Sequence, residues 1–406
     1  MKLNCKIKKI LFYSICFQIL MLHCLWAWAE EKTPELSIAV QITVYNVQAA
    51  IEKKEYLKAE KTLRKYIAKH PEKPNYLVEF TLGNTLTLIG RDKEAIVHYK
   101  ASADLYSGYA PAWQNMGKIY FDIKEYEKAG DCLLKTYQLD KSKNHLLLYN
   151  AAVSFIMAEK AEKALPHLDY LVSGDADTVK IEWVEAFLRV CMDLQRKGKA
   201  FKKINRLLHK DSGNPDLWKV MAQFHLWQND YKSALAALTV RSYLEPVKKR
   251  EDIMLMGDLS NVVGIPVRAA ACYENLLEGQ AKGSDYKKLA SAYIAAHRQG
   301  KALEVLNIAL KKKPCPKLFF MLGRTLYYEN LFNRADDAFD KCIRLNPKNG
   351  RAYLMKGYCS LKLKDNKAAR TAFEKAADCP KQKEAAEKIL RYLGRSPIQS
   401  KKLPTE

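Results

Sequence analysis

Residues 350–377, GRAYLMKGYCSLKLKDNKAARTAFEKAA, repeat the pattern of residues 111–137, PAWQNMGKIYFDIKEYEKAGDCLLKTY. In each segment an aromatic residue precedes a glycine by four positions, and an alanine follows that glycine by twelve. This alanine recurs along the chain every 33 to 36 residues. Its positions are Ala59, Ala95, Ala129, Ala164, Ala200, Ala234, Ala269, Ala302, Ala335 and Ala369. A fixed period of this length predicts an array of similar structural units.

Each unit is expected to be a hairpin of two amphipathic helices, because apolar residues recur at helical spacing on both sides of a short polar turn such as IKEYEK. A small residue stands twelve positions before the alanine in most units, where we expect it to let the two helices cross closely. These small residues are Gly83, Gly117, Ala222, Gly257, Ala290, Gly323 and Gly357. One hairpin cannot bury both its faces, so a continuous core requires stacking of neighbouring hairpins. The expected fold class is therefore an all-α solenoid of about ten helical hairpins.

The units are expected to begin near residues 40, 76, 110, 145, 180, 215, 250, 283, 316 and 350. The solenoid would then cover 40–380, preceded by a linker at 30–39 and followed by a capping helix at 381–393 and a disordered tail at 394–406. The fifth unit departs most from the pattern. Lys199 and Ala200 compete for its alanine position, and Phe187 stands where glycine is preferred. A hinge or an altered stacking angle is expected there.

The repeating pattern resembles that of the tetratricopeptide repeat proteins. The family pattern Trp-x2-Leu-Gly-x2-Tyr, then Ala-x3-Phe, then Pro, is similar to two sets of residues in this chain. They are Trp113, Met116, Gly117, Tyr120, Ala129 and Leu133, and then Phe319, Leu322, Gly323, Leu326, Ala335, Phe339 and Pro347. The resemblance implies a right-handed superhelix whose first helices line a concave groove that receives an extended peptide or a partner helix.

A narrower resemblance is to exported tetratricopeptide proteins associated with TonB/ExbB/ExbD energy-transduction systems. Three C-terminal segments carry it: residues 216–238, DLWKVMAQFHLWQNDYKSALAAL, residues 264–279, GIPVRAAACYENLLEG, and residues 350–377. It implies a periplasmic location and association with outer-membrane transport.

The first 29 residues have the layout of a secretory signal peptide. Lys2, Lys6, Lys8 and Lys9 precede an apolar stretch at 10–25, and Ala27-Trp28-Ala29 supplies small residues for cleavage after Ala29. The alternative is an uncleaved membrane anchor, because the apolar stretch approaches the roughly 20 residues that span a bilayer. In both cases the body of the chain is expected outside the cytoplasm, in the periplasm.

The chain is strongly basic. Removing the four signal lysines from 68 basic residues leaves 64 against 45 acidic ones, a net charge of +19. Export argues against nucleic acid as the partner, and a diffuse positive charge can also simply keep an elongated protein soluble. The densest stretch lies between 196 and 210 and includes Arg196, Lys197, Lys199, Lys202, Lys203 and Arg206. It is either a solvated helix face or a contact for lipid head groups or an acidic envelope component. Binding of peptidoglycan or lipopolysaccharide through this surface is an alternative function.

The tetratricopeptide resemblance also implies groove-facing positions, namely the second, fifth, ninth and twelfth residues of each unit. We therefore expect a partner protein or peptide to contact Asn84, Gln114, Lys118, Lys219, Gln223, Asp258, Asn261, Arg324 and Tyr327. In the fourth and fifth units the same positions are apolar, which predicts an internal filler or a hydrophobic docking site. They are Leu146, Tyr149, Val153, Ile156, Ile181, Val184 and Leu188. A shift of the frame by one residue would bury them in the core instead.

Catalytic motifs are absent from the sequence. It contains no HExxH, no GxSxG, no P-loop and no dinucleotide-binding glycine pattern, and its histidines are scattered. The cysteines beyond the signal show no CxxC spacing, although Cys342 and Cys359 would permit a disulfide across neighbouring helices. We expect a non-catalytic protein with no cofactor and no metal. The competing enzyme hypothesis is a helical-hairpin array similar to that of prenyltransferase subunits.

Overall fold

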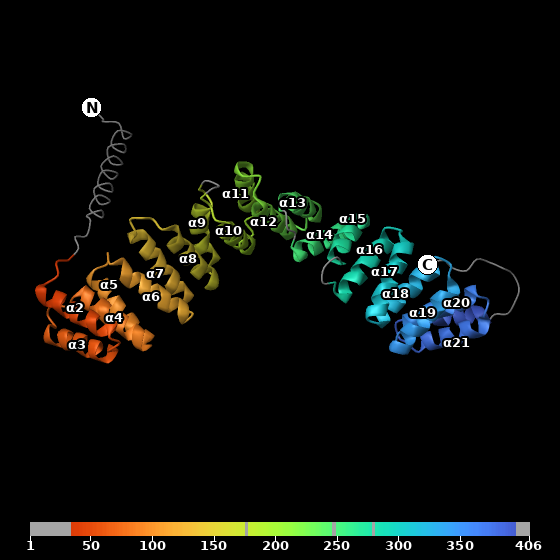
Figure 1. The fold of residues 1–406 in the computed structure, drawn as a ribbon, viewed down its shortest axis with the longest axis horizontal. Coiled ribbons are helices and arrows are strands. Elements are labelled where there is room, and N and C mark those ends of the chain that lie inside the picture. The colour runs from red at the N-terminus through yellow and green to blue at the C-terminus, as the bar shows by residue number, and fades with distance from the viewer. Residues whose placement is uncertain (1–33, 175–177, 246–248, 278–280, 395–406) are drawn as a thin grey trace, which may run out of the picture. The chain divides into compact units, whose positions relative to one another are not determined.

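The computed structural model describes residues 34–174, 178–245, 249–277 and 281–394, and every regular element among them is an α-helix (Figure 1). The expected signal peptide and the tail from residue 395 lie outside the described residues. From the N-terminal side the helices are α2 (Ile38–Glu52), α3 (Tyr56–Lys69), α4 (Tyr76–Ile89), α5 (Asp92–Leu105), α6 (Ala110–Asp122), α7 (Tyr126–Leu139), α8 (His145–Met157), α9 (Ala161–Leu171), α10 (Ile181–Asp193) and α11 (Lys197–Lys210). They continue as α12 (Pro215–Trp227), α13 (Tyr231–Leu244), α14 (Arg250–Val262), α15 (Pro266–Leu277), α16 (Gly283–Ala295), α17 (Gln299–Lys312), α18 (Pro316–Tyr328), α19 (Phe332–Leu345), α20 (Gly350–Lys362), α21 (Asn366–Ala377) and α22 (Lys383–Gly394).

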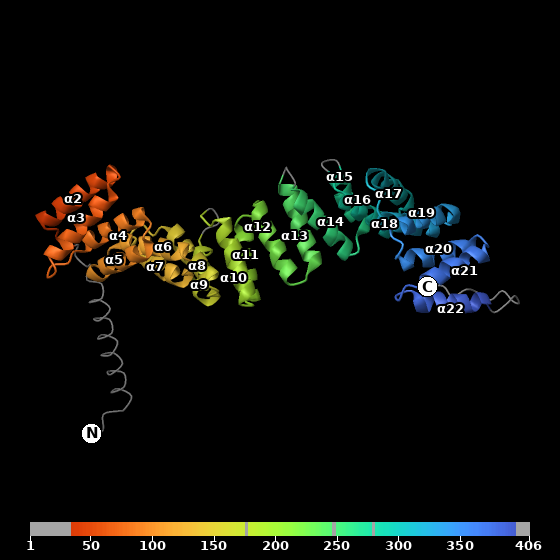
Figure 2. The same ribbon diagram turned by 90° about the horizontal axis from the view of Figure 1, so that it is seen from below.

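The chain divides into two compact units, residues 1–203 and 204–406, with the division falling inside α11. Within each unit, successive hairpins lie side by side (Figures 1 and 2). Helices pack on their immediate neighbours in the chain, for example α6 on α7 and α7 on α8 in the first unit and α18 on α19 in the second. The expected all-α hairpin solenoid is confirmed.

All ten hairpin turns are built in the same way. The fifteenth residue of each hairpin has a positive φ angle, and the next residue donates its backbone N–H to a carbonyl five positions earlier, as Glu125 does to Tyr120 at 2.8 Å. Among the described residues, those with positive φ in the hairpin turns are Lys54, Gly90, Lys124, Glu159, Gln195, Asn229, Gly264, His297, Asn330 and Lys364, and Lys143, between α7 and α8, is a further residue with positive φ. This is the Schellman geometry that ends helices, and it normally favours glycine. Glycine stands at this position in only two of the ten described hairpin turns.

The alanines that reveal the period are core residues. Ala59, the first, and Ala369, the last, are both 0% exposed, and so are the eight between them. A larger side chain at this place would have to displace the facing first helix, because protein interiors are close-packed. The alanine spacing therefore reports a real packing constraint.

The glycines have a role beyond the expected close crossing of the two helices. A Cβ atom on Gly257 would lie 2.6 Å from the ring of Tyr273, and one on Gly83 would lie 2.7 Å from the ring of Tyr99. Gly323 faces Phe339 in the same way, and Gly357 faces Phe373. The small residue makes room for an aromatic ring of the second helix rather than only for a close crossing of the two backbones.

The expected frame of the fifth hairpin is wrong by one residue. Val184 and Leu188, which we expected on a groove wall, are 1% and 2% exposed and belong to the core. The positive φ of Gln195 agrees with a hairpin that begins at residue 181. Ala200, which is 0% exposed, is accordingly the marker alanine, and Lys199 is exposed. Because apolar residues follow one another in this hairpin, the sequence did not show at which residue the hairpin begins.

The last described helix, α22, packs on α21. Ala386 is buried, and Ile389, Leu390 and Leu393 pack around the cluster that contains Phe373. Cys342 and Cys359 are both buried free thiols, so the disulfide that their spacing permits is not formed in this structure.

Candidate functional site

The first helices of two neighbouring hairpins, α6 and α8, border a pocket of about 380 Å³. We call it the α6–α8 pocket. Its polar lining residues are Gln114, Asn115, Lys118, Asp122, Asn150 and Ser154. Its other lining residues are Gly117, Phe121, Leu133, Leu147 and Val153, of which Leu133 reaches the pocket from α7. This volume lies within the range of roughly 300–1,000 Å³ that is typical of ligand pockets.

Two of the expected groove residues, Gln114 and Lys118, stand together in this pocket. They are four positions apart on α6 and therefore share one helix face. Both are exposed, and neither forms a hydrogen bond or ion pair with another described residue. The α6–α8 pocket thus presents an amide and an ammonium group to a bound molecule, above an apolar lining.

Asn84 has a different environment. Its Oδ1 accepts hydrogen bonds from Tyr99 Oη at 2.8 Å and from Asn115 Nδ2 at 2.9 Å. Burial raises the pKa of Tyr99, so its phenol stays protonated and can donate. Asn84 therefore links three helices within the first unit, and its acceptor atom is already occupied.

Asp258 and Asn261 form a related cluster in the second unit. Tyr273 Oη donates to Asp258 Oδ1 at 2.6 Å and accepts from Asn261 Nδ2 at 3.2 Å. Lys288 of the next hairpin binds both carboxylate oxygens of Asp258 at 2.5 Å. Burial, followed by the bond to Asp258, raises the pKa of Tyr273 well above its ordinary value. The sequence indicated Asp258 and Asn261 only as groove positions, and it gave no sign that they bind Tyr273 and Lys288.

The remaining expected groove residues lie on α12 and α18. Arg324 is exposed, with its guanidinium carbon 5.8 Å from the ring centroid of Tyr328. Tyr327 is half-buried and packs edge-on against Tyr328 and Phe332. Lys219 and Gln223 are half-buried on α12. Arg324 is therefore the most accessible cation among the expected contacts in the second unit.

The expected apolar wall is only partly present. Leu146 is 50% exposed on α8, and Val153 lines the α6–α8 pocket. Tyr149, Ile156 and Ile181 are half-buried. With Val184 and Leu188 in the core, the exposed part of the expected wall is confined to α8.

The basic stretch beginning at Arg196 is partly neutralised by its own neighbours. Lys199 and Lys203 bind Asp169 at 3.1 and 2.9 Å, and Arg196 lies 3.6 Å from Glu162. Although burial opposes it, these lysines lower the pKa of Asp169, which keeps the carboxylate charged. Lys197 and Lys202 are exposed, and Arg206 is half-buried. The stretch is thus a weaker polyanion-binding surface than its sequence indicates.

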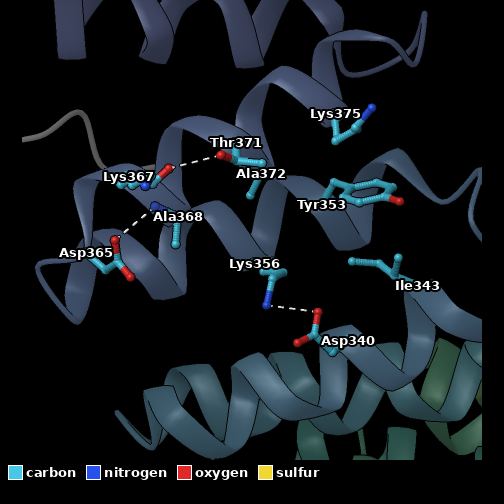
Figure 3. Close-up of a pocket in the computed structure, with 10 residues that line it drawn as sticks. All are labelled: Asp340, Ile343, Tyr353, Lys356, Asp365, Lys367, Ala368, Thr371, Ala372 and Lys375. Atoms are coloured by element: carbon cyan, nitrogen blue, oxygen red, sulfur yellow. Dashed lines mark hydrogen bonds and ion pairs between the residues drawn. The ribbon is translucent and has the colours of Figure 1, made fainter.

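A second pocket, of about 400 Å³, lies where α19, α20 and α21 meet (Figure 3). Lys356 Nζ binds Asp336 at 2.7 Å and Asp340 at 2.9 Å. Burial works to lower the pKa of Lys356, but the two carboxylates outweigh it and the pKa is raised. Lys367 and Lys375 line the same pocket.

Sequence reasoning missed this second pocket, although one signal was available. Lys356 stands at the seventh position of its hairpin, where other hairpins carry buried apolar residues. Those residues include Leu82, Met116, Met221, Leu289 and Leu322. A charged residue at a core position marks a site that needs its own explanation.

Nucleophilic and metal chemistry finds little support in the described part of the chain. Burial raises the pKa of Cys132, Cys191 and Cys359 to about 12, so these thiols stay protonated. Across the described ranges there is no group of three or more His, Cys, Asp or Glu side chains that could hold a metal ion. No helix within those ranges is both long and apolar enough to span a bilayer.

Two segments of the chain match family models described as tetratricopeptide repeat, residues 110–143 and residues 320–384. These segments are tetratricopeptide repeats. The first contains α6 and α7, including one wall of the α6–α8 pocket, and the second contains the pocket of Figure 3.

Curated relatives are distant. The chain is 20% identical over 289 residues to the DnaJ homolog subfamily C member 7 homolog of Dictyostelium discoideum, a match that covers 67% of this chain and 49% of that protein. It is 24% identical over 264 residues to the human mitochondrial import receptor subunit TOM70, covering 64% of this chain and 38% of the receptor. The matches thus span half or less of the length of these relatives.

Solved structures with similar repeats include a C-terminal part of a tetratricopeptide repeat protein from Cytophaga hutchinsonii, 17% identical, with a TM-score of 0.44, covering 58% of this chain and 96% of that one. A tetratricopeptide repeat protein from Parabacteroides merdae is 16% identical, with a TM-score of 0.32, covering 62% of this chain and 98% of that one. The structure of YrrB, described as a TPR protein with an unusual peptide-binding site, is 20% identical, with a TM-score of 0.34, and covers 45% of this chain and 92% of that one.

Proposed function

We propose that this chain is a non-catalytic scaffold that binds segments of partner proteins through the first helices of its hairpins. The α6–α8 pocket carries this proposal, because it combines exposed Gln114 and Lys118 with an apolar lining, and one of its walls belongs to a tetratricopeptide repeat. Amide groups can bond the main chain of an extended peptide, while a lysine can pair with a carboxylate. Stacked hairpin repeats present extended binding surfaces of this kind.

The test uses the purified chain and a phage-displayed library of random heptapeptides, followed by fluorescence-anisotropy titration of the enriched peptides. Lys118→Glu should weaken binding of acidic peptides at the α6–α8 pocket by at least tenfold, and Arg324→Glu should do the same for peptides that bind α18. The matched controls are Lys61→Glu on α3 and Lys341→Glu on α19, both exposed lysines on second helices. Equal affinity in all four variants would refute the groove assignment.

We also propose that the chain works in the periplasm, after cleavage of residues 1–29. The lysines followed by an apolar stretch and Ala27-Trp28-Ala29 support this proposal. Fusion of residues 1–40 to alkaline phosphatase, which is active only after export, tests it in a Gram-negative host. An inactive fusion would reject export. N-terminal sequencing of the exported fusion would separate cleavage after Ala29 from retention as an anchor.

Association with a TonB/ExbB/ExbD-type complex is the finer proposal. It is supported by the resemblance of residues 216–238, 264–279 and 350–377 to exported proteins associated with such systems. Purified periplasmic domains of TonB and ExbD are the appropriate probes, tested by biolayer interferometry against the chain and its Arg324→Glu variant. Lack of binding to either domain would remove this partner without affecting the scaffold proposal.

A further inference from the structure

Seven of the ten hairpins obey a size rule between their eighth and twenty-fourth residues. Four of them pair a glycine with an aromatic ring: Gly83 with Tyr99, Gly257 with Tyr273, Gly323 with Phe339 and Gly357 with Phe373. Four others carry a larger residue in the glycine position and leucine in the ring position. They are the hairpins with Val47 and Leu63, Ala152 and Leu168, Ala222 and Leu238, and Ala290 and Leu306. In the glycine–aromatic and alanine–leucine hairpins the combined volume of the two side chains is thereby kept similar, as a close-packed core requires. Val47 with Leu63 in the first hairpin and Leu188 with Ile204 in the fifth make larger pairs.

The third hairpin departs from this rule in the other direction, because its pair of side chains is smaller than in every other hairpin. It has Gly117 at the eighth position and Leu133 at the twenty-fourth. It therefore has neither a larger residue in the glycine position nor an aromatic residue in the ring position. A Cβ on Gly117 would lie 3.0 Å from Leu133 Cγ, so the leucine packs directly on this glycine, although its side chain is shorter than the rings of the sister hairpins. Both residues line the α6–α8 pocket. The pocket therefore lies beside the place that a sister hairpin fills with an aromatic side chain.

The preceding hairpin shows which aromatic side chain this place accommodates. There the Tyr99 ring lies against Gly83, and its Oη donates to Asn84 and accepts from Asn115 Nδ2 at 3.3 Å. One repeat later, the position of Asn115 is taken by Asn150 and that of Asn84 by Lys118. Asn150 and Lys118 both line the α6–α8 pocket. Donors for a phenol oxygen are thus present where the ring is missing.

We propose that the α6–α8 pocket binds the side chain of a tyrosine in an extended segment of the partner protein. The ring lies against Gly117 and Leu133, and the hydroxyl accepts from Asn150 and Lys118. Phenylalanine would fill the same space but leave those donors without a partner, and a smaller aliphatic side chain would leave part of the pocket empty. This inference rests on the proposed scaffold function and specifies the chemistry of its ligand.

The first experiment uses p-cresol, the side-chain analogue of tyrosine, and toluene, that of phenylalanine. Backbone amide spectra of the isotope-labelled chain should show a saturable shift at Gly117 with p-cresol, and a several-fold weaker response with toluene. Leu133→Phe recreates the pairing of Gly323 with Phe339, and Gly117→Ala recreates that of Ala152 with Leu168, so both variants should fold. Each should weaken p-cresol binding at least tenfold, whereas Leu345→Phe on the exposed surface of α19 should not. Unchanged binding in Leu133→Phe and Gly117→Ala would overturn the inference.

The second experiment separates this inference from the function on which it rests. Heptapeptides enriched on the wild-type chain should contain tyrosine at one fixed position. Replacing this tyrosine of the peptide by alanine should lower the affinity at least tenfold. The Leu133→Phe substitution in the protein should lower it by at least the same factor. Enriched peptides that lack a fixed tyrosine and bind Leu133→Phe equally well would reject the tyrosine pocket and leave the scaffold function standing. If no peptide is enriched at all, both proposals fail.

Discussion

The ring of Tyr273 lies 2.6 Å from the point at which a Cβ atom on Gly257 would stand. No real Cβ occupies such a position, so Gly257→Ala must push the ring or the helix aside. We expect the unfolding free energy to fall by about 1–3 kcal/mol, the usual cost of overpacking. Gly300→Ala is the matched control, because nothing lies within 4 Å of its Cβ position and α17 can accept alanine. Chemical denaturation should leave that variant unchanged or up to about 1 kcal/mol more stable.

Lys124 has a positive φ of 66° at the turn between α6 and α7. Glycine adopts this conformation without the steric cost that a Cβ atom imposes. Lys124→Gly should therefore raise the unfolding free energy by roughly 0.5–1 kcal/mol, after allowance for the greater flexibility of glycine in the unfolded chain. Lys61→Gly, within α3, should lower it by about 1 kcal/mol. Thermal midpoints that move in the same direction for both variants would contradict this account of the turns.

Lys356 binds Asp336 and Asp340 from a position that is apolar in other hairpins. Lys356→Leu should lower the unfolding free energy by roughly 1–2 kcal/mol, because two half-buried carboxylates lose their partner and water screens only part of the loss. Adding Asp336→Ala and Asp340→Ala to this variant should recover most of the stability. If the triple variant is no more stable than Lys356→Leu in urea titrations, then Lys356 stabilises the second unit by packing and not through its charge.

His167 stacks on Phe155, with the ring centroids 6.1 Å apart, and its burial lowers its pKa below the ordinary 6.5. The unfolded chain therefore takes up a proton at this residue before the folded chain does. Above the unfolded pKa the residue is neutral in both states and has no effect, and stability is lost as the pH falls below about 6.5. His167→Gln should make the fall in melting temperature between pH 7.5 and pH 5 less steep. A melting-temperature slope in His167→Gln equal to that of the unmodified chain would contradict the prediction.

The alanine period predicted the hairpins because it reflects one contact, the packing of this alanine against the first helix, which is repeated in every unit. This contact does not depend on which side chains surround it. The fifth hairpin was misread by one residue because Phe187 and Leu188 are both large where a small residue normally marks the frame. The hydroxyl networks of Tyr99 and Tyr273 were missed for another reason. Their partners Asn115 and Lys288 belong to the following hairpin, and only the stacking of hairpins brings them close.

The candidate site was predictable in part. Gln114 and Lys118 follow from the groove positions of the repeat, and both line the α6–α8 pocket. The pocket itself lies beside Gly117, where the second helix carries Leu133 and not an aromatic ring, and this difference becomes visible only when hairpins are compared with one another. The partial neutralisation of the basic stretch could not be predicted, because Asp169 precedes Lys203 by 34 residues.

In the seven hairpins that obey it, the size rule between the eighth and twenty-fourth residues makes the hairpin a self-contained unit. Its two helices share a matched interior, so exchange of whole hairpins between positions keeps both members of the pair together. A crossover placed at the polar turn would instead combine the first helix of one hairpin with the second helix of another. Glycine combined with leucine would leave a cavity, and alanine combined with tyrosine would overpack the interior. Recombination of such arrays, in the laboratory or by gene duplication, should therefore be tolerated at the loops between hairpins and selected against at the turns within them.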